Sequence, residues 1–214
     1  MHARMSRHRP HPHIRLPSSA DGMAIGLMGG SFDPPHSGHA HVIETARKAL
    51  GLDRVWVFVA AGNPLKRTQT AFVDRLSSAG RRLAGRRTIV SALEAQLGLT
   101  YTIDLLRRLK RRAPQARFVW IMGGDNLTQF HLWRRWKEIA RLVPIAVISR
   151  PGASPKAGLS RFARTFPRAR IPEDAAQTLK DRSAPAWVWI SAPLDPASST
   201  ELRTKMMAAA LPPD

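Results

Sequence analysis

The sequence of 214 residues has no cysteine, and its 15 acidic residues are outnumbered by 34 lysines and arginines. Without cysteine, neither a disulfide scaffold nor a cysteine-ligated zinc site can form, and a reducing compartment is permitted. No apolar run approaches the roughly 20 residues that span a membrane, and the N-terminus lacks the apolar stretch of a secretory signal. We therefore expect a cytoplasmic protein that has no membrane partner.

The shortage of acidic residues leaves a net charge of +19. Such a surface attracts polyanions, either nucleic acid or small polyphosphates such as ATP, and charge alone does not separate the two. A basic solvated surface is the third reading. A nucleic-acid-binding protein should interleave aromatic and basic residues on one face, whereas the arginines here are scattered over predicted helix surfaces. We therefore treat a basic nucleic-acid-binding protein as the less favoured alternative.

The chain divides into a short tail and one domain. Residues 1–22 combine His, Arg, Pro and Ser with almost no apolar content. They cannot bury enough surface to offset the entropy of ordering, so they are predicted to form a disordered basic tail. The remainder, 23–214, is long enough for one substantial core and too short for two. We therefore expect it to be a single domain.

Continuous apolar runs recur along that domain, as in strands buried on both faces of a parallel sheet. They cover residues 24–28, 55–60, 118–122, 144–148 and 187–190, with a shorter candidate at 88–90. Helical patterns lie between them at 41–50, 104–112 and 132–142, and residues 151–172 are interpreted as a long loop or weak helices. This alternation predicts a Rossmann-like, doubly wound α/β fold. Such folds bind ligands beyond the carboxyl ends of their strands.

The segment after the first strand carries the strongest chemical signal. It reads Gly29-Gly30-Ser31-Phe32-Asp33-Pro34-Pro35-His36-Ser37-Gly38-His39. Glycines directly after a strand let the backbone approach a ligand closely. Ser37 can cap the helix that follows, and a helix N-terminus suits phosphate. The segment therefore predicts a phosphate-binding loop.

His36 and His39 are spaced so that both imidazoles can face one ligand. A triphosphate attacked at its α-phosphorus gains negative charge on its oxygens, which donors stabilise. An attacking phosphate is already ionised near neutral pH, so no general base is needed. Incidental spacing and metal binding are the alternatives, but a metal site wants a third ligand and the sequence shows none. We therefore predict no protein metal site.

Two later segments also offer basic side chains that can donate to a ligand. Lys66 follows the turn signal Asn63-Pro64 beyond the second strand, which places it on the ligand side of the sheet. Ser198 and Glu201 form a capping box, so a helix should begin there. Arg203 then adds a bidentate donor. The alternative for this second segment is an ordinary capped C-terminal helix.

The sequence resembles the nucleotidyltransferases that share a His-x-Gly-His signature, and within them the bacterial nicotinate-nucleotide adenylyltransferases. The resemblance covers nearly all of 24–205. Beside the first loop, it rests on Gly62-Asn63-Pro64-Leu65-Lys66, Tyr101-Thr102-Ile103-Asp104, Gly123-Gly124-Asp125-Asn126-Leu127 with Phe130, Trp133 and Trp136, Arg150-Pro151-Gly152, and Ser198-Ser199-Thr200-Glu201-Leu202-Arg203.

This resemblance implies that ATP and nicotinate mononucleotide react, with Mg²⁺, to give deamido-NAD and pyrophosphate. The implied ATP-binding residues are Gly30, Ser31, Phe32, His36, His39, Gly123, Asp125, Ser199, Thr200 and Arg203. The implied mononucleotide-binding residues are Lys66, Thr102, Trp133 and Arg150. The implied catalytic residues are His36, His39, Lys66 and Arg203.

Several alternatives stay open at this level. Thr102 either caps a helix or lies near the nicotinate ring. A tryptophan pair at helical spacing more often packs in a core, so we give Trp133 the stacking role and place Trp136 and Trp120 in the core. Sister enzymes with another phosphate acceptor, such as pantetheine-phosphate adenylyltransferase or a cytidylyltransferase, are the nearest rivals. A homo-oligomer is also an open alternative.

Overall fold

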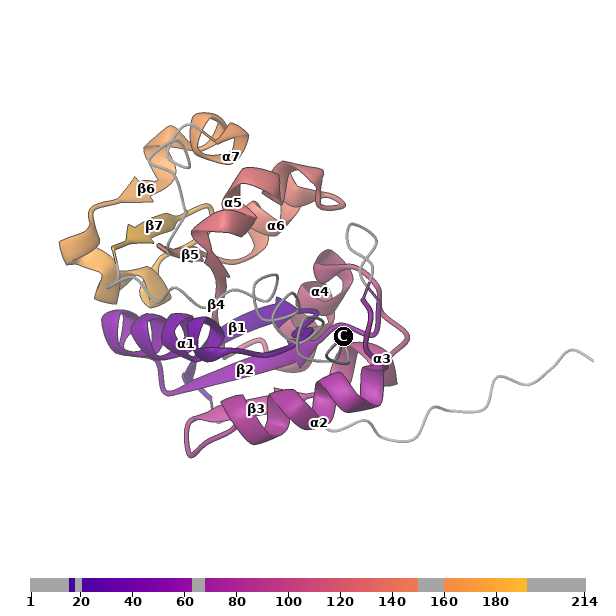
Figure 1. The fold of residues 1–214 in the computed structure, drawn as a ribbon. Coiled ribbons are helices and arrows are strands. Elements are labelled where there is room, and N and C mark those ends of the chain that lie inside the picture. Colours follow the sequence, from indigo (N-terminus) through magenta and orange to yellow (C-terminus); the bar gives the residue numbers. More distant parts are fainter. Residues whose placement is uncertain (1–15, 18–20, 63–67, 150–159, 192–214) are drawn as a thin grey trace, which may run out of the picture.

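A seven-stranded, entirely parallel sheet forms the centre of the computed structural model, which describes residues 16–17, 21–62, 68–149 and 160–191 (Figure 1). The strands are β1 Ala24–Gly30, β2 Arg54–Val59, β3 Thr88–Ser91, β4 Arg117–Gly123, β5 Ile145–Ile148, β6 Arg170–Ile171 and β7 Trp187–Ile190. Their order across the sheet is β3-β2-β1-β4-β5-β7-β6. The Rossmann-like fold class expected from the apolar runs is confirmed.

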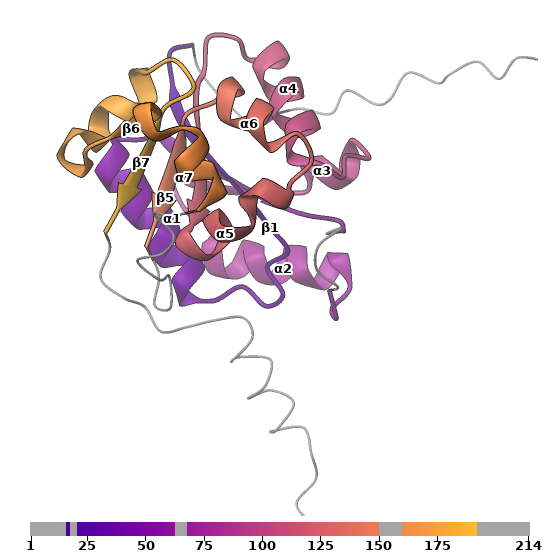
Figure 2. The ribbon, with the colours of Figure 1, turned by 90° about the horizontal axis from the view of Figure 1, so that it is seen from above.

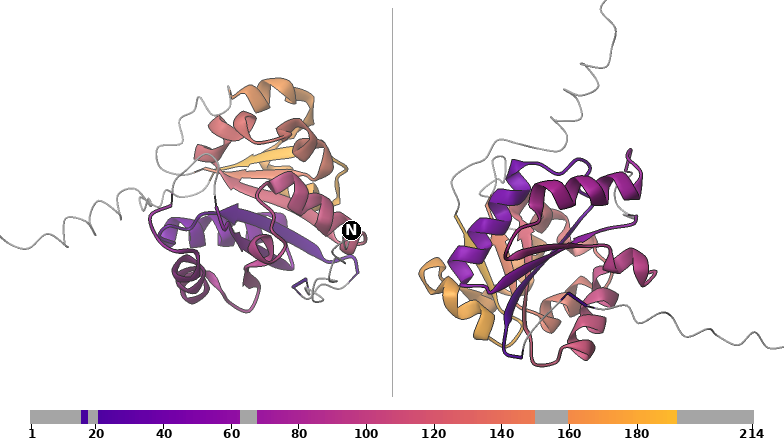
Figure 3. Two further views of the ribbon diagram at one scale, coloured as in Figure 1. Left: turned by 90° about the vertical axis from the view of Figure 1, so that its right-hand side faces the viewer. Right: turned by 90° about the horizontal axis from the view of Figure 1, so that it is seen from below.

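Helices cover both faces of this sheet (Figures 2 and 3). The helices are α1 Ser37–Leu50, α2 Phe72–Leu83, α3 Leu93–Gln96, α4 Thr102–Arg112, α5 Gly124–Gln129, α6 Trp136–Leu142 and α7 Arg161–Thr165, with 3-10 segments η1 Phe130–Leu132, η3 Pro167–Ala169 and η4 Glu173–Asp181. In the described residues, no helix is long and apolar enough to cross a membrane.

Alternate residues of each strand supply two separate cores. Ile25 and Leu27 of β1 pack with apolar residues of α3 to α7, whereas Ala24 and Met28 pack with residues of α1, α2 and η4. Side chains of successive strand residues point to opposite faces, so a strand between two helical layers must be apolar at every position. This is why the strands read as unbroken apolar runs.

The sequence missed elements whose pattern is short or broken. The candidate strand at 88–90 is confirmed as β3, but β6 has only two residues and lies inside the segment interpreted as loop or weak helices. In the same segment, α7 and η3 confirm the weak helices. Helix α2 was not predicted, because Arg75 stands on its buried side and interrupts the apolar period.

Three helix starts differ from expectation. The N-cap of α1 is His36 and that of α4 is Tyr101, so neither Ser37 nor Thr102 is a cap: each is the first residue of its helix. The helix predicted over 132–142 covers only 136–142. Arg135 takes a left-handed conformation with φ of 56°, and a residue in that conformation cannot continue a right-handed helix. The chain between η1 and α6 therefore turns.

Gly29 shows how closely the core is packed beside the first strand. A Cβ added at Gly29 would lie 2.9 Å from Cη2 of Trp120, and Trp120 is itself only 1% exposed. A rigid indole in a filled core cannot move aside without displacing its neighbours. Gly80 of α2 offers a contrast, because an added Cβ there meets nothing within 4 Å.

Gly29→Ala should therefore destabilise the protein by about 1–3 kcal/mol, the usual cost of overpacking a core. Gly80→Ala is the matched control and should stabilise it by up to about 1 kcal/mol, because alanine restricts the unfolded chain and favours a helix. Urea unfolding of both variants measures the difference. Equal stabilities would contradict the packing argument.

Candidate functional site

The segments that follow β1 and β4 lie where the strand order of the sheet reverses. From β1 the chain builds outward through β2 to β3, whereas β4 pairs with the other edge of β1 and continues to β5. Helix α1 begins after β1 and α5 begins after β4. Ligand crevices in doubly wound sheets form at such a switch point. The segments following Gly30 and Gly123 therefore lie where such a crevice is expected.

The structure assigns the glycines of β1 a different role from the one expected. Gly29 and Gly30 are the last residues of β1 rather than part of the loop. A Cβ on Gly30 would lie 3.1 Å from the ring of Phe32, which is 2% exposed. Phe32 itself has φ of 48°, a conformation that costs a non-glycine residue about 1 kcal/mol or more. Packing of its ring against β1 holds this turn in place.

The rings of the two histidines lie against each other at the start of α1, tilted by 40°. His36 is the N-cap and is 1% exposed, and its ring centroid lies 3.8 Å from that of His39. The backbone N–H of His36 donates to Nδ1 of His39 at 3.2 Å. A neutral imidazole that accepts at Nδ1 carries its proton on Nε2. His39 is therefore oriented as a donor through Nε2, which suits a site that must neutralise developing charge.

Arg75 of α2 is a buried neighbour of the first loop that the sequence did not reveal. Its side chain is 2% exposed and donates to four backbone carbonyls, those of Ser31, Ala60, Ala61 and Thr70. Burial lowers the pKa of its guanidinium, and the negative charge of Asp33 opposes that effect. No motif marks this residue, because the carbonyls it binds come from distant parts of the chain.

The β4 side presents Gly123 and Asp125, as expected. Gly123 is buried and is the N-cap of α5. Asp125 is exposed in the first turn of α5. Gly123 is the last residue of β4 and Asp125 follows it, next to the end of β1. Their placement is compatible with the ribose contact that the resemblance implies.

Thr102 and Trp133 lie on neighbouring elements. Thr102 is the first residue of α4, and Trp133 is half-buried between η1 and α6, with its ring centroid 5.3 Å from that of Phe130 and 6.0 Å from that of Trp120. Trp120 is in the core as expected, and Trp136 packs against the core from a half-buried position.

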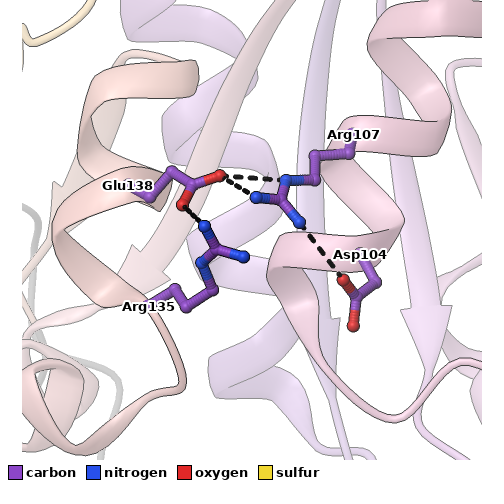
Figure 4. A network of polar contacts seen from close by, with 4 residues as sticks. All are labelled: Asp104, Arg107, Arg135 and Glu138. Carbon is purple, nitrogen blue, oxygen red and sulfur yellow. Dashed lines mark hydrogen bonds and ion pairs between the residues drawn. The ribbon is translucent and has the colours of Figure 1, made fainter.

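A polar network joins the elements that carry Thr102 and Trp133 (Figure 4). Arg107 of α4 binds Glu138 of α6, and Arg135 donates to the other oxygen of Glu138 at 2.7 Å. Asp104 lies 3.8 Å from Arg107. Single exposed ion pairs stabilise little, but a shared carboxylate between two guanidinium groups orients all its members. The network therefore fixes α4 relative to α6.

Five predicted site residues lie outside the described residues. They are Lys66, Arg150, Ser199, Thr200 and Arg203. The capping box of Ser198 and Glu201 also lies there, as does most of the predicted N-terminal tail.

A parallel sheet with a histidine-bearing loop at its switch point defines an α/β protein that binds nucleotides, and the chain belongs to the cytidylyltransferase-like family, whose profile matches residues 27–205. Within that broad family, its close relatives carry a narrower name. A protein of Rhizobium johnstonii named "probable nicotinate-nucleotide adenylyltransferase" is 50% identical over 190 residues, which cover 88% of this chain and 96% of the relative. One of the same name from Caulobacter is 51% identical and covers 85% and 97%.

Solved structures agree with the fold. A Plasmodium falciparum nicotinic acid mononucleotide adenylyltransferase, solved as its complex with NaAD, superposes with a TM-score of 0.62 at 21% identity and covers 85% of this chain and 83% of its own. Its complex with APC gives a TM-score of 0.60 at 20% identity, with the same coverage. The resemblance drawn from the motifs is thus confirmed at the level of family and fold.

Glu94 of α3 is a buried carboxyl group that the sequence did not single out. It is 6% exposed, and burial raises its pKa from 4.5 to about 7. Between these values the folded protein keeps the proton that the unfolded chain has released. Stability must therefore fall as pH rises through this window and level off above it.

The glutamine of Glu94→Gln does not titrate, so the stability of this variant should not show the decrease with rising pH that Glu94 causes. Relative to the unsubstituted protein it should gain about 2–3 kcal/mol between about pH 4 and pH 8. Urea unfolding at several pH values measures the gain. Glu44→Gln is the control and should show the opposite sign, because a hydrogen bond from Arg47 lowers the pKa of Glu44. A flat difference for Glu94→Gln would contradict the burial argument.

Proposed function

We propose that this protein transfers the adenylyl group of ATP to nicotinate mononucleotide and releases deamido-NAD and pyrophosphate, a step of NAD biosynthesis. The observation that carries the proposal is the close contact of the His36 and His39 rings at the start of α1, where Nδ1 of His39 accepts from the backbone and leaves Nε2 as the donor. The names of the relatives, about 50% identical over most of the chain, support the same reaction.

The reaction is a displacement at phosphorus. A phosphate oxygen of the mononucleotide forms a bond to the α-phosphorus of ATP, and the bond from that phosphorus to the bridging oxygen of pyrophosphate breaks. Charge then builds on the bridging and equatorial oxygens, where imidazole donors and the N-terminal end of α1 stabilise it. Because the attacking oxygen is already ionised, neither histidine needs to remove a proton.

The substrates are assigned to the two sides of the crevice. On the ATP side we place Gly30 at the end of β1 and Ser31, Phe32, His36 and His39 of the first loop. To the same side we assign Gly123 at the end of β4, Asp125 of α5, and Ser199, Thr200 and Arg203 from the C-terminal segment. On the mononucleotide side we place Lys66, Thr102, Trp133 and Arg150. The roles of the residues outside the described part rest on the motif resemblance alone.

The Mg²⁺ expected with ATP is proposed to arrive with the nucleotide. In the described part of the chain, no group of three or more His, Cys, Asp or Glu side chains could hold a metal ion. Mg²⁺ commonly keeps several waters and binds through substrate phosphates rather than an all-protein cage. When bound, it would neutralise phosphate charge. The cytoplasmic location, the single domain and any homo-oligomer stay predictions.

The direct test is to incubate the purified protein with ATP and each acceptor. Deamido-NAD should form from nicotinate mononucleotide. His39→Ala should lower kcat by about 10²–10³, the usual loss when one donor to a developing oxyanion is removed. His41→Ala, two residues further along α1, should keep most of the activity.

Product from pantetheine phosphate or from CTP instead would favour a sister enzyme, and salt-sensitive RNA binding tighter than ATP binding would favour the nucleic-acid alternative.

Trp133 and Trp136 should separate binding from packing. Trp133→Ala should raise KM for nicotinate mononucleotide by about tenfold, because an aromatic stacking contact contributes on the order of 1 kcal/mol or more, and should leave KM for ATP nearly unchanged. Trp136→Ala should chiefly lower stability, because this ring packs against Phe130, Phe162 and Phe166. Steady-state kinetics with thermal unfolding distinguishes the two. Equal effects on KM would contradict the assignment.

A further inference from the structure

The guanidinium of Arg75 is nearly saturated with backbone acceptors. Nε donates to the carbonyl of Thr70 at 3.1 Å, and Nη1 donates to those of Ser31 and Ala60 at 2.6 and 2.9 Å. Nη2 donates to the carbonyl of Ala61 at 3.2 Å. A guanidinium has five N–H donors in a rigid plane. Four of them are therefore committed to main-chain oxygens.

These four carbonyls belong to the segments that leave two adjacent strands. Ser31 follows β1, Ala60 and Ala61 follow β2, and Thr70 stands just before α2. Asp33 adds a parallel tie, since its Oδ2 accepts from the backbone N–H of Gln69 at 2.7 Å. Arg75 and Asp33 together fasten the first loop to the chain that follows β2.

The first loop includes a backbone conformation that must be held in place. Its turn at Phe32 has a positive φ, which is unfavourable for a residue with a side chain. Ser31 immediately precedes that turn, and its carbonyl makes the shortest of the four bonds. A bond at this point restrains the backbone that leads to His36. The buried guanidinium of Arg75 thus helps to hold the backbone conformation at Ser31 and Phe32.

We infer that Arg75 is a positioning residue for ATP: it holds the backbone of residues 31–33 in the conformation that presents the loop to the phosphates. This inference rests on the proposed function. Arg75 does not itself contact the nucleotide, because four of its five donors are occupied by main-chain carbonyls and its side chain is only 2% exposed. It acts through the main chain of Ser31 and, with Asp33, through the segment beyond β2.

Lysine cannot replace this arrangement. An ammonium group has three donors and no fixed plane, so Arg75→Lys keeps the charge but must leave at least one carbonyl without its donor. Methionine keeps much of the length and removes every donor. The pair therefore separates the effect of charge from that of the fork-shaped hydrogen bonding.

The experiment compares Arg75→Met and Arg75→Lys with Arg82→Met, and uses Arg75→Ala and Arg82→Ala for rescue by added guanidinium ion. Arg82 lies on the same helix and is exposed, and no side-chain partner is seen for it within the described residues. Arg75→Met should raise KM for ATP at least about tenfold, the effect of losing roughly 1.4 kcal/mol of binding. Arg75→Lys should fall between, and Arg82→Met should match the unsubstituted protein.

A merely structural role would give a different pattern. It would lower the folded, active fraction, and hence kcat, while KM for ATP stayed the same. Added guanidinium ion at low, non-denaturing concentration should also lower the raised KM of Arg75→Ala by filling the vacated position, and should not do so for Arg82→Ala. Unchanged KM for ATP in folded Arg75→Met and Arg75→Lys would overturn the inference.

The same variants keep the inference separate from the proposed function. If the unsubstituted protein makes no deamido-NAD, the proposed function fails. Binding of α,β-methylene-ATP, measured by calorimetry, then still tests Arg75. At least about tenfold weaker binding by Arg75→Met supports the positioning role, and equal binding overturns it. If Arg75→Met does not fold, binding of α,β-methylene-ATP by Arg75→Lys decides between the two outcomes.

Discussion

The close approach of β1 to its surroundings is the constraint on which the site depends. This strand pairs with β2 on one side and β4 on the other, and three of its residues are glycines. A Cβ on Gly26 would lie 2.5 Å from Cδ1 of Ile121, and one on Gly29 would press on Trp120. Filled cores do not yield easily. The strand that leads into the first loop is therefore held by contacts on both faces.

Two polar clusters extend this rigidity from the sheet to the loops. Arg75 binds the carbonyls that follow β1 and β2, and the Arg107–Glu138 contact joins α4 to α6. Each cluster links segments that are distant in sequence. The proposed ATP side depends on the first and the proposed mononucleotide side on the second. The histidines can then act as fixed donors, because the backbone that carries them is restrained before a ligand arrives.

Local patterns explain which parts could be predicted. The five apolar runs are strands, and the spacing of His36 and His39 does bring their rings together, because both lie on one turn at a helix start. Helix caps were less predictable. Serine and threonine are common caps, yet His36 and Tyr101 occupy these positions, since the preceding turns decide where helical dihedrals begin.

The sequence by itself determined the layered fold and the family, because hydrophobic period and short motifs act over neighbouring residues, and it predicted the donor chemistry of the first loop. Only the tertiary structure decided which charges are buried. Arg75 looks like any helix-surface arginine in sequence, and Glu94 like any helix glutamate, yet both are almost inaccessible to water. Burial depends on what distant segments cover, and the acceptors of Arg75 come from three separate positions in the chain. No local pattern carries that information.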